Sequence, residues 1–266
     1  MIPLLQVISE TKDRLSAANH VSLFLEFDGT LVPISPDPTV PRLDPHTTQT
    51  LELIAGQDSV WTTVISGRAV EDLYTRIRVN GLVYAGNHGL EIFGRNLRFV
   101  NPAASCQRRL LDRLCDELAV QLRPISGAKV EYKGLTASVH HRQATEHDSS
   151  RIEEIVRAAV DRTGGSFELN PGNKVLEILP QTGWHKEAAV RWINSRLGDP
   201  ETLSIYLGDD SCYDGALSAL PNSVTIRVGE TPTTRAKCRL PGPTGVHEFL
   251  LWLAIQQAVR PTQVMK

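Results

Sequence analysis

Short apolar runs alternate along this chain with longer stretches in which apolar residues recur every three or four positions. The short runs predict buried strands, and the longer stretches predict amphipathic helices. The predicted strands are Val21–Phe27, Val60–Ile65, Leu82–Ala85, Leu203–Leu207 and Ser223–Val228. The predicted helices are Pro45–Ala55, Ala69–Ile77, His185–Leu197 and Val246–Ala258. This alternation predicts an α/β fold, in which a mostly parallel sheet carries helices on both faces.

The middle of the chain has a different order of predicted elements. A helical pattern is followed by two alternating segments, which predict a hairpin, and the same order then repeats. The predicted elements are a helix over Cys106–Leu122, a hairpin of Val130–Tyr132 and Leu135–His141, a helix through Ile152–Ala159 that ends at Gly164-Gly165, and a hairpin of Phe167–Leu169 and Lys174–Leu179 around a turn at 170–173. We therefore expect a small α+β domain, residues 103–180, inserted into a core domain made of residues 1–102 and 181–266.

The composition is that of an ordinary globular protein, with 41% hydrophobic and 22% charged residues. A formal net charge of −2, without a basic stripe, argues against nucleic acid or a membrane surface as a partner.

No apolar run approaches the ~20 residues that span a bilayer, and segment 1–20 lacks the apolar core of a signal peptide. The four cysteines lack a metal-site spacing, which predicts reduced thiols in a cytoplasmic protein; they are Cys106, Cys115, Cys212 and Cys238.

Two carboxylates end the first predicted strand, in the segment Leu23-Phe24-Leu25-Glu26-Phe27-Asp28-Gly29-Thr30-Leu31. The alternation of a strand sends the side chains of Glu26 and Asp28 to the same side of the strand end. There they can share one Mg²⁺ with a phosphate. A solvated acidic turn is the alternative, and the apolar character of the preceding strand argues against it.

Three further signals lie at other strand or helix ends. Ser66, in Ser66-Gly67-Arg68, follows the second strand, where it can belong to an anion site or act as an ordinary helix cap. Lys186 opens a predicted helix and can neutralise a phosphate, although a lone helix lysine is usually a surface residue. Asp209 ends the strand Leu203–Leu207 and its Gly208 turn, and is a natural Mg²⁺ ligand with Asp210 beside it.

In this order and spacing, the four signals resemble the motifs of the haloacid dehalogenase superfamily of phosphatases. The resemblance implies a Rossmann-like parallel-sheet core with an inserted α+β cap domain for substrate recognition. It implies that residue 26 attacks phosphorus and that Asp28 protonates the leaving alcohol and then activates water. Ser66 and Lys186 would orient and screen the phosphoryl oxygens. The implied cofactor is Mg²⁺, held by Glu26, the backbone carbonyl of Asp28 and Asp209, with Asp210 beside Asp209 as a further predicted ligand.

Other segments resemble the trehalose-6-phosphate phosphatase family. They are Ala85–Glu91, similar to the family's Gly-x-His-Gly-x-Glu; Glu131-Tyr132-Lys133, similar to its Glu-x-Lys; Gly172–Ile178, similar to its Gly-x-Lys…Glu; and Gly183-Trp184-His185-Lys186, similar to its lysine motif. A disaccharide phosphate needs carboxylates for its hydroxyls and cations for its charge. The resemblance implies substrate contacts by Arg68, His88, Glu91, Glu131, Lys133, Arg142, Lys174 and Glu177. We expect Glu131, Lys133, Lys174 and Glu177 to alternate along the hairpins; the alternative is a set of cross-strand salt bridges on a solvated face.

Two positions depart from the family's pattern. Glu26 stands where the nucleophilic aspartate belongs, and its extra methylene moves the carboxylate by about an ångström, a shift that can cost on the order of 10²-fold in rate. Tyr213 stands where the family's third aspartate belongs, with Asp214 one residue further along. Both departures replace residues that the resemblance implies for the reaction, whereas the residues implied for sugar contacts match the family's pattern.

We therefore expect a Mg²⁺-dependent phosphatase that hydrolyses trehalose 6-phosphate to trehalose and phosphate, slowed or retuned by Glu26. Two other hypotheses stay open. The first is a catalytically inactive sugar-phosphate-binding protein that regulates a trehalose-6-phosphate synthase partner. The second is a phosphatase of another glycosyl phosphate, or an Asp→Glu variant of an active enzyme.

Overall fold

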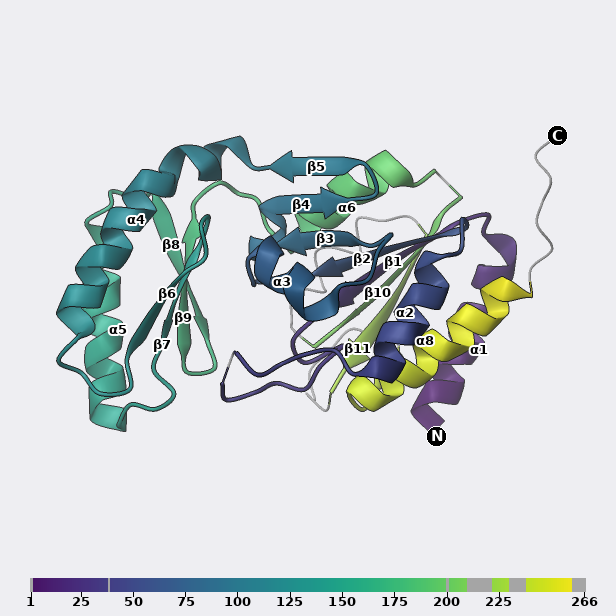
Figure 1. Cartoon of the computed structure of the whole chain (residues 1–266), viewed down its shortest axis with the longest axis horizontal. Coiled ribbons are helices and arrows are strands. Elements are labelled where there is room, and N and C mark those ends of the chain that lie inside the picture. Colours follow the sequence, from purple (N-terminus) through teal and green to yellow (C-terminus); the bar gives the residue numbers. More distant parts are fainter. Residues whose placement is uncertain (1, 38, 200, 210–221, 230–237, 260–266) are drawn as a thin grey trace. The chain divides into compact units, whose positions relative to one another are not determined.

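A computed structural model describes residues 2–37, 39–199, 201–209, 222–229 and 238–259 of the chain (Figure 1). The chain divides into two compact units. Unit 1 comprises Met1–Arg98 and His185–Lys266, and unit 2 comprises Phe99–Trp184. The predicted domain edges at Pro102 and Pro180 lie close to these divisions. No helix among the described residues combines the length and the apolar composition needed to cross a bilayer.

Unit 1 is built on an eight-stranded sheet in the order β12-β11-β10-β1-β2-β3-β4-β5. The strands of this sheet are β1 (Val21–Glu26), β2 (Val60–Ile65), β3 (Val83–Gly86), β4 (Glu91–Gly94), β5 (Leu97–Val100), β10 (Leu203–Gly208), β11 (Ser223–Val228) and β12 (Cys238–Leu240). The division between the units falls within β5, after Arg98. All neighbours from β12 to β3 pair in parallel, and β3 pairs with β4 antiparallel. Every residue of β1 and of β10 is buried, as expected for central strands covered on both faces.

The helices of unit 1 are α1 (Ile2–Ala17), α2 (Pro45–Ala55), α3 (Val70–Ile77), the 3₁₀ turn η1 (Asn87–Gly89), α6 (Lys186–Leu197) and α8 (Pro243–Ala258). Helix α8 packs against α2 and α1 (Figure 1). The core beneath them draws on the apolar strand residues that the sequence singles out, including Leu23, Leu25, Val64, Ile205 and Ile226. The predicted α/β fold with a parallel sheet is confirmed. The short strands β4, β5 and β12 were not predicted.

Unit 2 contains a four-stranded antiparallel sheet and two helices. Its elements are α4 (Pro102–Leu122), β6 (Lys129–Tyr132), β7 (Ala137–His140), α5 (Glu146–Asp161), β8 (Phe167–Gly172) and β9 (Val175–Pro180). The strand order is β6-β7-β9-β8. Buried residues alternate along β9, where Leu176 and Ile178 join the core formed with Leu118 of α4 and Ile152 and Val156 of α5. The period of two therefore separates a face that packs on the helices from a more polar face.

The turn predicted at residues 170–173 is wrong. Strand β8 continues to Gly172, which pairs with Val175, so the turn consists of Asn173 and Lys174. Pro171 is tolerated within β8 because this strand lies at the sheet edge, where the missing N–H of proline breaks no ladder hydrogen bond. Lys174 has a φ of 58°, so it does not continue the alternation of β9.

His141, directly after β7, predicts a pH dependence of the stability of unit 2. The residue is 3% exposed, and its Nδ1 atom has no hydrogen-bond partner among the described residues. Burial lowers the pKa of His141; of the nearby charges, Glu153 and Glu146 oppose this shift while Lys174 and His140 add to it. Because the unfolded chain binds a proton near pH ~6.5 that the folded chain resists, stability is lost as the pH falls below that value.

We expect the melting temperature of the chain to fall between pH 7.5 and pH 5.5, and the fall to be smaller in His141→Gln. His147→Gln, which removes an exposed histidine of the same unit, is the matched control. It should retain the pH dependence of the unaltered chain. Equal slopes of melting temperature against pH in the His141 variant and the unaltered chain would contradict the prediction.

Candidate active site

Four predicted residues come together at the carboxyl edge of the parallel sheet. Strand β1 lies between β2 and β10, and all three run in the same direction. Glu26 ends β1, Ser66 follows β2, and Asp209 follows β10, while Lys186 begins α6. The carboxyl ends of parallel strands open into the crevice where ligands bind in such folds.

The carboxylate of Glu26 is buried and surrounded by donors. Its Oε1 atom accepts hydrogen bonds from Lys186 Nζ at 2.8 Å and from Tyr206 Oη at 2.6 Å. The backbone N–H of Asp209 donates to Oε2 at 3.3 Å. The residue is only 2% exposed, so the ammonium of Lys186 compensates a charge that water barely reaches.

Tyr206 was not predicted as a site residue, because its partner becomes visible only from the register of the folded strands. Tyr206 of β10 pairs in register with Phe24 of β1, two residues before Glu26. Residues two apart on a strand share a face, so Tyr206 points to the same side of the sheet as Glu26. A buried tyrosine needs a partner for its hydroxyl, and Glu26 is that partner.

Two glycines leave room for these carboxylates. A Cβ atom on Gly208 would lie 2.6 Å from Cδ and 2.8 Å from Cγ of Glu26, so the longer glutamate side chain fills the space beside this glycine. A Cβ atom on Gly29 would lie 2.1 Å from Oδ2 of Asp209, and Gly29 has a φ of 76° that favours glycine. The carboxylate of Asp209 therefore lies directly against the turn that follows β1.

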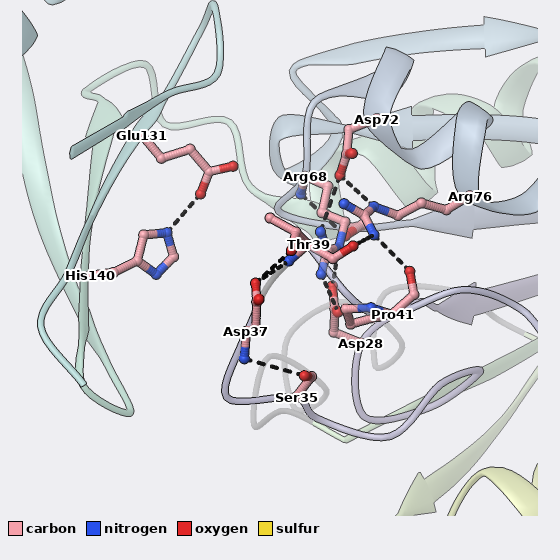
Figure 2. Close-up of polar contacts among 11 residues, drawn as sticks. Asp28, Ser35, Asp37, Thr39, Pro41, Arg68, Asp72, Arg76, Glu131 and His140 are labelled. Atoms are coloured by element: carbon pink, nitrogen blue, oxygen red, sulfur yellow. Dashed lines mark hydrogen bonds and ion pairs between the residues drawn. The ribbon is translucent and has the colours of Figure 1, made fainter. Parts of the chain in front are cut away.

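Asp28 is paired with Arg68 in a two-pronged ion pair (Figure 2). Arg68 donates from Nε to Oδ2 at 2.8 Å and from Nη2 to Oδ1 at 2.7 Å. Burial acts to lower the pKa of Arg68, but the hydrogen bonds and charges of Asp28 and Asp72 outweigh it, and the pKa lies above its usual value. Arg68, predicted as a substrate contact, thus holds the predicted proton donor.

Ser66 makes hydrogen bonds with its own turn and with the loop after β3. The Oγ atom of Ser66 accepts from the backbone N–H of Arg68 at 3.2 Å, and the carbonyl of Ser66 accepts from His88 N at 2.9 Å. Helix α3 begins at Val70 with Ala69 as its N-cap, so Ser66 is not the cap of that helix. Glu91 supplies the missing cap instead, because its Oε1 atom accepts from the N–H of Val70 at 2.8 Å.

A row of polar residues crosses the sheet of unit 2, and it contains two of the implied sugar-binding residues, Glu131 and Glu177. The register aligns Glu131 with Ser138, Ser138 with Glu177, and Glu177 with Asn170. Because Leu176 and Ile178 point into the helix-covered core, Glu177 and this polar row occupy the opposite face. The row crosses all four strands.

A hydrogen bond and an ion pair link residues of this polar face. His140 Nε2 lies 2.7 Å from Glu131 Oε2 (Figure 2), and Lys133 Nζ lies 3.8 Å from Glu177 Oε1. The expected alternation of Lys174 with Glu177 is wrong, because Lys174 lies in the turn and its Nζ donates to Glu146 Oε1 at 2.9 Å. Arg142 donates from Nη2 to the carbonyl of Asn173 at 2.8 Å.

Oxygen ligands of the kind that suit Mg²⁺ gather where β1 and β10 end. Glu26 and Asp209 contribute carboxylates from neighbouring strands, and Gly29 and Gly208 keep Cβ atoms out of the space around them. This donor chemistry fits a hard cation. The predicted ligand Asp210, like Tyr213, lies outside the described residues. Within the described part of the chain, no group of three or more His, Cys, Asp or Glu side chains has a metal-site arrangement.

The parallel sheet and the inserted α+β unit define an α/β fold, which a solved haloacid dehalogenase-like hydrolase shares. The family model described as trehalose-phosphatase matches residues 24–233. The chain therefore belongs to the trehalose-phosphatase family, a family of phosphoric monoester hydrolases.

Relatives support this assignment over most of the chain. An uncharacterized glycosyl hydrolase of Mycobacterium tuberculosis is 36% identical over 96% of this chain and 20% of its own length. A trehalose-phosphate phosphatase of Mycobacterium ulcerans is 32% identical over 88% of this chain and 62% of its own length. The chain thus spans a fifth of the first relative and less than two thirds of the second. The crystal structure of a trehalose-6-phosphate phosphatase related protein matches with a TM-score of 0.79 at 20% identity, covering 89% of this chain and 98% of that one.

Proposed function

We propose that this chain is a Mg²⁺-dependent phosphatase that hydrolyses trehalose 6-phosphate to trehalose and phosphate, with Glu26 as the attacking carboxylate. The observation that carries the proposal is the set of contacts around Glu26. A carboxylate that is 2% exposed and bound by a lysine ammonium and a tyrosine hydroxyl is held in one place, which supports a role as a positioned nucleophile.

The proposed reaction has two steps. A carboxylate oxygen of Glu26 forms a bond to phosphorus as the bond from phosphorus to the sugar oxygen breaks, and Asp28 gives that oxygen a proton. Water, which gives a proton to Asp28, then attacks the phosphorus of the glutamyl phosphate, releasing phosphate and restoring Glu26. Lys186 offsets charge on the phosphoryl oxygens. Mg²⁺, which Glu26 and Asp209 would hold together with the proposed ligands Asp28 and Asp210, would supply further charge neutralisation for the same group.

The polar row of unit 2 is the proposed sugar-recognition surface. Its carboxylates and amide, on Glu131, Glu177 and Asn170, accept and donate hydrogen bonds as a disaccharide requires. Lys133 lies next to Glu177 and adds a cation to this face. Among the proposed contacts of unit 1, Glu91 already caps α3 and Arg68 already binds Asp28.

One observation favours a second candidate function, that of a non-catalytic sugar-phosphate-binding protein that acts on a trehalose-6-phosphate synthase. Both carboxylates that the reaction needs are held in ion pairs, Glu26 with Lys186 and Asp28 with Arg68. The hydrolytic proposal requires that one carboxylate oxygen of Asp28 leave Arg68 and carry the proton when substrate binds, while the other prong keeps Asp28 in place. The binding proposal requires no such exchange. The cytoplasmic location stays a prediction from the cysteines.

Phosphate release from trehalose 6-phosphate, sucrose 6-phosphate and glucose 6-phosphate tests the proposed function. We expect release from trehalose 6-phosphate with Mg²⁺, much less from the other two, and none after chelation with EDTA. Calorimetric titration with trehalose 6-phosphate accompanies the assay. Binding without release would overturn the phosphatase in favour of the binding protein, and preferred release from another sugar phosphate would overturn the assigned substrate.

A further inference from the structure

Asp72 on the first turn of α3 joins two arginines (Figure 2). Its Oδ2 atom accepts from Arg68 Nη1 at 3.1 Å and from Arg76 Nε at 2.8 Å. Burial acts to raise the pKa of Asp72, but the hydrogen bonds and charges of Arg76 and Arg68 outweigh it, and the pKa lies below its usual value. Asp72 therefore stays an anion between two cations.

The guanidinium of Arg68 is fixed by its contacts on several sides. Its Nε and Nη2 atoms face Asp28, its Nη1 atom faces Asp72, and its Cζ atom lies 5.5 Å from the centre of the Phe27 ring. The side chain is 12% exposed, against 38% for Asp28. Because a guanidinium is planar and rigid, an anchor at Nη1 also sets the direction of the prongs that hold Asp28.

Arg76 extends the same network to the loop that follows β1. Its Nη1 atom donates to the carbonyls of Thr39 at 3.0 Å and of Pro41 at 2.7 Å. Asp37 holds that loop locally, since its Oδ1 atom accepts from Thr39 N at 2.9 Å and from Thr39 Oγ1 at 2.7 Å. Asp72 is thus the member of the network that both arginines share, as Figure 2 shows.

We propose that Asp72 is a positioning residue for the reaction: it orients Arg68, and through Arg68 it sets the place of the Asp28 carboxylate. This inference rests on the proposed function, in which Asp28 transfers the proton. Without the charge of Asp72, Arg68 and Arg76 remain side by side with no anion between them, and Arg68 turns away from the direction in which it now presents Asp28. Asp72 touches none of the reacting atoms itself.

Asp72→Asn tests the proposal, with Glu71→Gln as the matched control. Glu71 is the neighbouring acid on the same helical turn, exposed to solvent. We expect Asp72→Asn to lower kcat by about tenfold with KM changed less than about twofold, because misplacement of a reacting group slows the chemical step rather than binding. Asp72→Glu, which keeps the charge, should recover part of kcat, and Glu71→Gln should leave both constants unchanged.

The Nε–H signal of Arg68 in the nuclear magnetic resonance spectrum, identified by its loss in Arg68→Lys, gives a readout that needs no turnover. We expect Asp72→Asn to move this signal and to speed its exchange with water, and Glu71→Gln to do neither. A signal unmoved by Asp72→Asn, or a kcat equal to that of the unaltered chain, overturns the positioning role. Absence of turnover in the unaltered chain overturns the phosphatase instead, and the Arg68 signal then decides the role of Asp72 alone.

Discussion

Replacement of Lys186 by methionine is expected to lower the free energy of unfolding by about 3–5 kcal/mol, because it leaves a buried carboxylate without its cation. The side chain of Glu26 is 3% exposed and that of Lys186 is 11% exposed. Methionine keeps much of the length and the apolar stem of lysine while removing the charge. Phosphate release should also stop, since the ammonium that orients Glu26 and screens the phosphoryl group is gone. Urea denaturation and a phosphate assay measure the two effects.

A double variant tests whether the loss of stability comes from the unpaired charge of Glu26 or from the changed side-chain shape at position 186. Glu26→Gln combined with Lys186→Met removes both members of the pair, so the stability should largely return while the activity does not. Tyr206→Phe is a milder test, because it removes a neutral donor to Glu26 and should lower stability by about 1–2 kcal/mol. If Lys186→Met proves as stable as the unaltered chain, the pair does not hold the site together.

Gly208→Ala is expected to lower kcat/KM by on the order of 10²-fold. The added Cβ atom would lie 2.6 Å from Cδ and 2.8 Å from Oε2 of Glu26, so the carboxylate must move away from Lys186 and Tyr206. Gly208 does not have a positive φ, so the effect is steric and not one of backbone strain. Overpacking of this kind should also lower the free energy of unfolding by about 1–3 kcal/mol.

Gly242→Ala is the control for this substitution. A Cβ atom on Gly242, at the start of α8, would meet nothing within 4 Å. The control should therefore leave kcat/KM unchanged and alter stability by no more than the ordinary difference between glycine and alanine at a helix start. Full activity in Gly208→Ala would show that the position of the Glu26 carboxylate does not limit the rate.

The parallel sheet could be predicted from the sequence because its central strands are continuous apolar runs between helical segments. Strands β4, β5 and β12 could not, because they are only three or four residues long and mix polar with apolar residues. The hairpin turn of unit 2 was misplaced because the Asn-Pro-Gly sequence is typical of turns. Pairing of Asn170 with Glu177 and of Gly172 with Val175 places those residues in the edge strand instead.

The positions of three candidate site residues could also be predicted, since Glu26 is the last residue of an apolar strand, and Ser66 and Asp209 directly follow such strands. What the sequence could not show is how their side chains pair. The bond from Tyr206 to Glu26 depends on register between strands 180 residues apart, and the bidentate pair of Arg68 with Asp28 joins residues 40 apart. Asp72 belongs to none of the motifs in the sequence. Its contacts with Arg68 and Arg76 become visible only in the fold, because α3 places its carboxylate beside both arginines.

Trapping of a covalent intermediate shows whether Glu26 attacks phosphorus. The chain is mixed with Mg²⁺ and with trehalose 6-phosphate that carries the radiolabel in its phosphate group. The reaction is quenched in acid within one turnover, and the protein is digested for peptide mapping. We predict label on the peptide that contains Glu26, lost under alkaline conditions as an acyl phosphate would be, and absent in Glu26→Gln. Release of phosphate with no label on that peptide would contradict the assignment of Glu26 as the nucleophile.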